Sequence, residues 1–423
     1  MKGRVVKKII GIVLLLLILI WGGFELSKYR FGYFMSAPNL QEPRAYHQSL
    51  LINDNEVLVT GGLNSPRNEK LGLKSAEIYS VKKNLFKKVS DTNLPHLYHK
   101  MFKMSDGNVV IADINGIEIY DHQKKNFKLL KSKFANRYQE FNNYNFQLLP
   151  NDRLLVVGGR SECKKVFDDD LCNVNKLEII DLHNDILVKS LNLNGTGQGL
   201  ALLPDGNLLI FGGKIYDDKK EFFTDEIYHL NTKSYKLSSW GKLPVSMINP
   251  FVFKTSNDEI VLIGGKIFNG KQPFRDFEYA RYKGCPNIYV INILTKSIRA
   301  LAITEYLEKN EVFMDQIIDV QQISDSLYWL QLRANKKHNS IVFDIYKNEL
   351  KDYGTLFMLP TMRYRSSNIK LPNEILLSGG KLFYQEISEY VIDSEPVFYA
   401  KELNKATSEG GFILDDTVIL KIK

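Results

Sequence analysis

One short pattern recurs along almost the whole sequence. Two β-prone apolar runs flank a turn rich in Asp, Asn and Gly, and a pair of glycines often follows the second run. A complete copy reads GLALLPDGNLLIFGG and covers residues 199–213. Turn residues of this kind between apolar runs predict a β-hairpin. Because the pattern returns at intervals of roughly 40 to 60 residues, it indicates a repeat architecture.

The chain contains eight copies of this hairpin pattern. Five copies end in a Gly pair, whose second members are Gly62, Gly159, Gly213, Gly265 and Gly380, and three copies without it occupy residues 103–114, 322–332 and 412–422. After each of the first seven copies, a bulky apolar residue is followed by another one seven positions later. These pairs are Tyr79 and Phe86, Tyr120 and Phe127, Ile180 and Leu187, Tyr228 and Tyr235, Ile291 and Ile298, Phe343 and Leu350, and Ile392 and Tyr399. Each pair predicts a second hairpin, so the expected unit has four strands.

The combined pattern of strand, Gly-Gly, spacer and aromatic-Asp resembles the kelch repeat over about residues 44–423. It departs from that repeat because the usual last-position Trp is never present and the second and sixth units lack the Gly pair. The resemblance implies a β-propeller, in which radial packing of twisted four-stranded sheets buries their faces. We therefore expect an all-β kelch-like propeller with seven full blades plus a partial eighth unit at 408–423. The alternative is an eighth blade completed by N-terminal residues.

The N-terminal segment is strongly apolar. Residues 9–24 read IIGIVLLLLILIWGGF, with Lys2, Arg4, Lys7 and Lys8 before them and Lys28 and Arg30 after them. The length and the charge bias predict a signal anchor at 9–27 with a cytoplasmic N-terminus at 1–8. A linker at 28–43 and a periplasmic or extracellular propeller at 44–423 would follow. A cleaved signal peptide and a buried core helix are the two other interpretations.

The net charge of +8 is concentrated at the N-terminus. Residues 1–30 hold six basic residues and one acidic residue, which is +5, so the other 393 residues carry only +3. A nearly neutral propeller lacks the basic surface that nucleic-acid binding needs. The expected partners are therefore the membrane, through the N-terminal helix, and an envelope protein or glycan.

The connections differ in length in a regular way. They are short inside each hairpin but long at 63–75, 128–143, 160–176, 214–225 and 266–287. Alternate connections of a four-stranded blade leave on opposite faces, so the long ones should share one face, which is the candidate binding surface.

Cys163 and Cys172 lie in one such loop and are predicted to form a disulfide, which leaves Cys285 unpaired. Asp168 to Asp170 are interpreted as a solvated turn, so no metal site is expected.

Alignment of the units brings one position of each to the mouth of the central channel. The residues at this position are His47, His99, Tyr144, Gln198, Pro250, Ile317, Arg365 and Ser408. The polar ones could simply bind channel water. The ligand-binding candidates are His47, His99, Tyr144, Gln198 and Arg365, joined by Arg44 because a guanidinium suits a carboxylate or sulfate.

These features favour a membrane-tethered module that binds a protein or glycan through the long-loop face. No catalytic set or cofactor site is identified. The alternative is a carbohydrate-active enzyme such as a sialic-acid mutarotase or epimerase, for which His47 or His99 with Arg365 could supply an acid–base pair. A galactose-oxidase-like copper enzyme is disfavoured, because its family pattern needs a Cys crosslinked to a Tyr and the sequence around Cys285 shows no such pattern. A sialidase is disfavoured because the Ser-x-Asp-x-Gly-x-Thr-Trp box is absent from the sequence. A purely structural envelope component is the third hypothesis.

Overall fold

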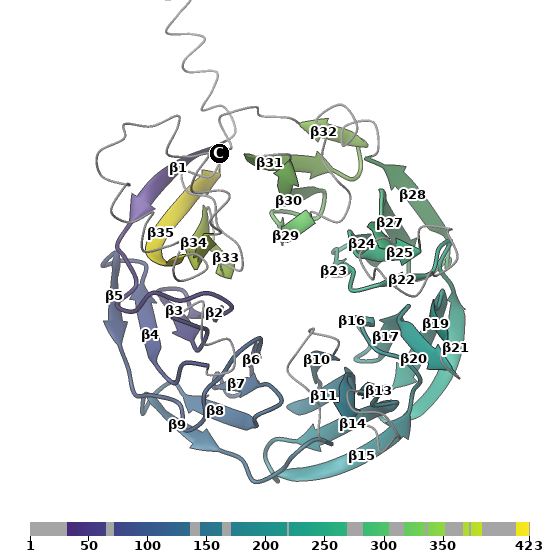
Figure 1. Ribbon diagram of the computed structural model, residues 1–423, viewed down its shortest axis with the longest axis horizontal. Coiled ribbons are helices and arrows are strands. Elements are labelled where there is room, and N and C mark those ends of the chain that lie inside the picture. Colours follow the sequence, from purple (N-terminus) through teal and green to yellow (C-terminus); the bar gives the residue numbers. More distant parts are fainter. Residues whose placement is uncertain are drawn as a thin grey trace, which may run out of the picture.

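The computed structural model describes residues 32–64, 72–135, 144–162, 171–217, 220–268, 282–303, 317–334, 337–351, 367–371, 374–382 and 412–422. Within these ranges the protein is built from antiparallel sheets arranged in a ring (Figure 1). No described helix is long and apolar enough to cross a membrane. The predicted anchor at 9–27 lies outside the described residues.

Six blades are formed from strands that are consecutive within each repeat unit, and in each the first strand is innermost. Blade 1 contains β2 (Gln48–Asn53), β3 (Glu56–Thr60), β4 (Ala76–Ser80) and β5 (Leu85–Lys88), and blade 2 contains β6 (Lys100–Lys103), β7 (Val109–Ala112), β8 (Ile117–Asp121) and β9 (Asn126–Leu129). Blade 3 contains β10 (Tyr144–Leu149), β11 (Arg153–Gly158), β14 (Lys176–Asp181) and β15 (Ile186–Asn192), and blade 4 contains β16 (Gly199–Leu202), β17 (Leu208–Phe211), β20 (Glu226–Asn231) and β21 (Lys236–Lys242). Blade 5 contains β23 (Phe251–Lys254), β24 (Glu259–Ile263), β27 (Asn287–Asn292) and β28 (Ile298–Ala302), and blade 6 contains β29 (Ile317–Gln322), β30 (Leu327–Ala334), β31 (Lys337–Asp344) and β32 (Glu349–Lys351).

One more four-stranded sheet joins the two ends of the described chain. It contains β33 (Ser367–Leu371), β34 (Glu374–Leu382), β35 (Phe412–Ile422) and β1 (Gly32–Ala37), in that order, and we call it the closing sheet. In Figure 1 the purple β1 lies beside the yellow β35. The strand β33 contacts both β2 and β29, so the closing sheet lies between blade 1 and blade 6.

The closing sheet corrects the expectation of a partial eighth unit. Residues 412–422 are one continuous strand, not a hairpin, and they pair with β34 on one side and with β1 on the other. The Asp415–Asp416 pair falls where the β34 ladder shifts between Ser378 and Gly380, so it forms an irregularity in the strand and not a turn. Residues 32–37, inside the segment predicted as a linker, supply the outermost strand. Ser408 lies outside the described residues.

The second hairpins are confirmed in all six blades, and in five of them the two residues of the predicted pair lie opposite each other. Tyr79 pairs with Phe86, Tyr120 with Phe127, Ile180 with Leu187, Ile291 with Ile298, and Phe343 with Leu350. The fourth unit also forms its second hairpin, from β20 and β21, but the turn lies two residues further along, so Leu230 pairs with Leu237 and Tyr228 lies opposite Ser239. Tyr235 lies in the turn, where its hydroxyl accepts a 2.6 Å hydrogen bond from Arg153. Ile392 and Tyr399 lie outside the described residues.

Apolar side chains fill the spaces between neighbouring sheets. One cluster joins Leu58 of blade 1 to Ile111 of blade 2, and equivalent clusters join blades 2 to 6 in order. Another joins Val59 of blade 1 to Leu376 of the closing sheet. Blades 1 to 5 are therefore each buried on both faces by their neighbours, which is the packing that radial repetition provides.

The ring has two distinct faces. The turns inside each hairpin, such as those after β2 and β4, lie on one face, which we call the tight-turn face. The connections from second to third strands and between sheets lie on the other, the long-loop face. On the long-loop face, three consecutive blades carry additional antiparallel ribbons. These are β12 (Arg160–Glu162) with β13 (Leu171–Asn173), β18 (Lys214–Asp217) with β19 (Lys220–Phe223), and β25 (Lys266–Phe268) with β26 (Tyr282–Gly284) and β22 (Met247–Ile248).

The Gly pairs hold adjacent backbones close together. In blade 4, Gly212 has a φ of 61° and Gly213 a φ of 128°, both in the left-handed region that favours glycine. The Gly213 amide donates a 2.9 Å hydrogen bond to the carbonyl of Met247, which precedes the inner strand of the next blade. A Cβ on Gly212 would overlap that same carbonyl oxygen. The glycines are therefore required by blade packing.

We predict that Gly212→Ala lowers the free energy of unfolding by roughly 1 to 3 kcal/mol or more, because it combines backbone strain with a clash against Met247. Gly241→Ala in the same blade is the matched control, since a Cβ there meets nothing within 4 Å. It should be neutral or slightly stabilising. Chemical denaturation of both variants measures the difference, and equal losses would contradict the assigned role of Gly212.

We also predict that a chain starting at residue 38 is less stable than one starting at residue 31. The shorter chain loses β1 and its six residue pairs with β35. At about 0.5 to 1.5 kcal/mol for each hydrogen bond, the loss should reach about 3 kcal/mol. Urea unfolding of the two chains checks this, and identical midpoints and slopes would show that β1 does not stabilise the ring.

Candidate functional site

The structure places four of the predicted site residues at the same end of neighbouring inner strands. His47, His99 and Gln198 immediately precede β2, β6 and β16, and Tyr144 is the first residue of β10. These inner strands contact one another in ring order. The four side chains are all buried, with exposed fractions of 1%, 0%, 3% and 7%. They share one height at the long-loop face, as the alignment of the units predicted, while Arg365 lies outside the described residues.

The two histidines each contact the preceding sheet. His99 Nε2 lies 2.8 Å from the hydroxyl of Thr60 in blade 1, and His47 Nε2 lies 3.0 Å from the hydroxyl of Ser378 in the closing sheet. Thr60 and Ser378 occupy equivalent positions, directly before a Gly pair. Each histidine therefore makes a polar contact that joins two neighbouring sheets. The sequence analysis did not assign this structural role to them.

A buried cation lies three residues before each of these histidines. Arg44 is fully buried, and its guanidinium donates hydrogen bonds to the carbonyl of Gly61 at 2.8 Å and to a Glu77 carboxylate oxygen at 2.7 Å. His96 occupies the equivalent position in the next unit, where its ring nitrogens lie 3.0 Å from Asp113 and 3.1 Å from Glu118. Because Arg44 is enclosed and ion-paired, its contacts are those of a packing residue.

The neighbouring histidines have opposite electrostatic environments. Burial alone would lower the pKa of His96, but hydrogen bonds and charge attraction from Asp113 and Glu118 raise that pKa to about 9. Burial holds the pKa of His99 well below its usual value, and the charge on His96 acts in the same direction. The two rings lie 5.5 Å apart, centroid to centroid. At neutral pH, therefore, His96 is a buried imidazolium and His99 a neutral imidazole.

Between each cation and its histidine lies a tyrosine that sequence reasoning missed. Tyr46 and Tyr98 have φ values of 59° and 56°, which are unusual for a residue other than glycine, Asn or Asp. Both are half-buried, and their rings meet edge to face at 4.7 Å. The signal that could have revealed them is the shared Tyr-His dipeptide at 46–47 and 98–99. At the equivalent position, blades 4 and 5 carry Gly197 and Asn249, also with positive φ.

The other predicted residues have more local contacts. Gln198 donates a 3.3 Å hydrogen bond to the carbonyl of Asn194, and the Tyr144 ring packs edge to face on Phe146. Cys172 lies in β13, opposite Ser161, but Cys163 is outside the described residues, so the disulfide remains a prediction. Cys285 is buried, and its thiol donates a 3.5 Å hydrogen bond to the carbonyl of Asn287.

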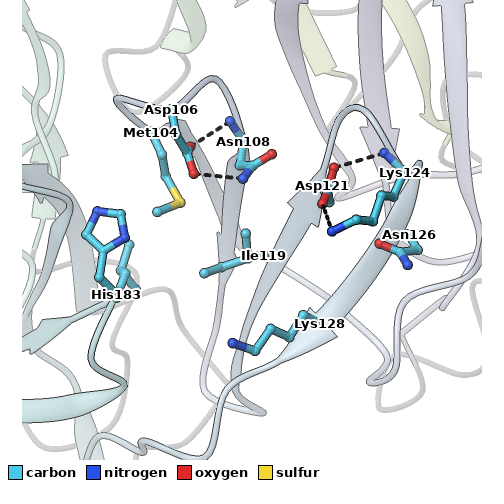
Figure 2. A pocket seen from close by; sticks show the side chains of 10 residues that line it. Met104, Asp106, Asn108, Ile119, Asp121, Lys124, Asn126, Lys128 and His183 are labelled. Atoms are coloured by element: carbon cyan, nitrogen blue, oxygen red, sulfur yellow. Dashed lines mark hydrogen bonds and ion pairs between the residues drawn. The ribbon is translucent and has the colours of Figure 1, made fainter.

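A pocket of about 370 Å³ lies on the opposite, tight-turn face, between blades 2 and 3 (Figure 2). Its carboxylates already have partners, because Asp106 accepts a hydrogen bond from Asn108 and Asp121 pairs with Lys124 at 3.1 Å. Its lining mixes acidic, basic and apolar groups: Met104, Asp106, Asn108, Ile119, Asp121, Lys124, Asn126, Lys128, Leu182 and His183. This arrangement specifies no single ligand charge.

Comparison with known proteins adds no family assignment. No protein-family model matches the chain, and a search of curated proteins found no similar sequence. The fold and the geometry of the long-loop face therefore carry the functional argument.

We predict that stability depends on pH through His96. Its folded pKa of about 9 exceeds the usual histidine value of 6.5, so its contribution to stability is fully present below pH 6.5 and is lost as the pH rises through about 9. Relative to His96→Gln, the native chain should lose up to about 3 kcal/mol over this range. Denaturation at a series of pH values measures it. A pH profile for His96→Gln identical to that of the native chain would contradict the assignment.

Proposed function

We propose that this protein is a membrane-tethered, extracytoplasmic β-propeller that binds a protein or glycan through its long-loop face. In this proposal the segment at 9–27 is the anchor, and the closing sheet acts as the seventh blade of a closed, kelch-type ring. β-Propellers commonly serve as binding modules, because a rigid ring carries loops of independent length. The long-loop face supports this use, since its ribbons in blades 3, 4 and 5 enlarge one rim and β13 contacts β18.

The observation that carries the proposal is the Tyr46–Tyr98 pair. Backbone strain in a non-glycine residue persists only where surrounding contacts enforce it, and such strain clusters at binding and active sites. Here two half-buried aromatic rings are held at the long-loop end of adjacent inner strands. Tyrosine is enriched where proteins bind partners, because it offers a large apolar surface and a hydroxyl at little entropic cost. We infer that this pair contacts the ligand directly.

The enzymatic alternative lacks an observation in its favour among the described residues. A mutarotase needs an acid–base pair that reaches its substrate, whereas His47 and His99 are enclosed and engage Ser378 and Thr60. Arg365, the third member of that hypothesis, is not among the described residues. Binding without chemistry is therefore the function we propose.

The test uses the full chain reconstituted in lipid nanodiscs and presented to a glycan array and to cross-linkable envelope proteins. We predict that Tyr46→Gly with Tyr98→Gly weakens binding at least about tenfold, the loss expected when two contact residues worth about 1 kcal/mol each are removed together. Glycine suits the positive φ, so the variant should remain folded.

Tyr235→Gly is the matched control. Tyr235 is also half-buried and has a φ of 56°, but it lies in a tight turn on the opposite face. It should leave binding unchanged. Full binding by the Tyr46–Tyr98 double variant would overturn the assignment of this site, and loss of binding in both variants would indicate a general effect of removing tyrosine.

A further inference from the structure

The direction of β1 determines the face from which the N-terminal segment reaches the ring. Glu374, next to the tight turn of β34, pairs with Lys421, so β35 ends at the tight-turn face. Gly32 pairs with Ile422 at that same end, and Ala37 pairs with Thr417 further toward the long-loop face. Because β1 starts at the tight-turn face, residues before 32 join the ring from that side.

The outer turns of this face carry exposed lysines. In five of the six blades, the turn between the third and fourth strands holds at least one exposed lysine: Lys82, Lys83, Lys124, Lys125, Lys233, Lys296 and Lys347. The inner turns carry aspartates, and Figure 2 shows this order in blade 2, with Asp106 on the inner turn and Lys124 on the outer turn. Two outer turns also expose apolar side chains, Leu294 at 77% and Tyr346 at 44%. Basic residues interspersed with exposed apolar ones suit the surface of an anionic membrane.

We propose that the tight-turn face lies on the surface of an anionic membrane and that the long-loop face points away from it. This inference rests on the proposed membrane anchor. Only residues 25–31 separate the apolar segment from β1, and seven residues span at most about 25 Å. The closing sheet is therefore held close to the lipid headgroups, where Lys28 and Arg30 add positive charge. Electrostatic attraction acts over about 10 Å at ordinary salt, so the nearby outer turns fall within its reach.

Some of these lysines are better tests than others. Lys124 pairs with Asp121, Lys125 pairs with Glu56, and Lys296 lies over the ring of Trp240. Lys82, Lys83, Lys233 and Lys347 are exposed and are spread over three blades, so they form the outer lysine set of the experiment.

The first measurement determines orientation. The full chain, with Cys163, Cys172 and Cys285 replaced by serine and its melting temperature checked, receives a dye at Ser234→Cys or Asn194→Cys. Both positions are exposed. Position 234 lies in the outer turn of blade 4 on the tight-turn face, and position 194 lies in the connection that leads into blade 4 on the long-loop face. In nanodiscs with an acceptor-labelled lipid, energy transfer should be higher from position 234. Equal or higher transfer from position 194 would overturn the orientation.

The second measurement tests the lysines. Transfer from position 234 should rise when phosphatidylserine replaces part of the neutral lipid, and added salt should reverse the rise. Changing the outer lysine set to glutamine should abolish the rise. The same change at Lys74, Lys88, Lys176 and Lys266, which are exposed on the long-loop side of the ring, removes equal charge and should preserve it. A rise in the outer-lysine variant equal to that of the parent would overturn the lipid contact and leave this face for a protein partner.

The two proposals fail in different ways. If alkaline carbonate releases the full chain from membranes, the anchor is wrong, and the inference about orientation falls with it. If the chain resists carbonate but the transfer data show no preference for position 234, the anchor stands and only the orientation is wrong.

Discussion

The ring depends on the close approach of backbones at the Gly pairs. Gly61 and Gly62 both have positive φ, and the Gly62 amide donates a 2.9 Å hydrogen bond to the carbonyl of His96 at the start of the next blade. The Gly213 amide makes the equivalent bond to Met247. A side chain at either pair would separate the two blades and remove the apolar contacts between their sheets. Where a blade ends its second strand in a Gly pair, the glycines thus set the spacing at which the other contacts with the next blade form.

The sequence predicted what is local in this fold and missed what is distant. Hairpins were predictable because turn residues and apolar periodicity lie within a few positions of each other. The closing sheet was not, because β1 and β35 stand almost 400 residues apart and neither strand carries a local sign of its partner. The 412–422 segment looked like a hairpin because Asp415 and Asp416 resemble a turn, yet unpaired strand edges on both sides favour a continuous strand.

The same division holds for the candidate site. Alignment of the units predicted that His47, His99, Tyr144 and Gln198 would share one height, since equivalent residues of a repeat occupy equivalent places. It could not predict their partners. His47 contacts Ser378, which is 331 positions away, and His96 acquires its charge only because folding brings Asp113 and Glu118 to it. His47, which was expected to line the channel mouth, therefore instead joins two neighbouring sheets.

The buried polar contacts explain how the strained tyrosines are held. Arg44, two residues before Tyr46, is held by its ion pair with Glu77. His47, the residue after Tyr46, is held by its contact with Ser378. Tyr98 has the same arrangement, with His96 before it and His99 after it. Left-handed backbone at a tyrosine costs on the order of 1 kcal/mol or more, and anchors on both sides leave the chain little freedom to relax that strain. Besides their contribution to stability, the ion pairs and the histidine contacts thus help to fix the orientation of two aromatic rings on the long-loop face.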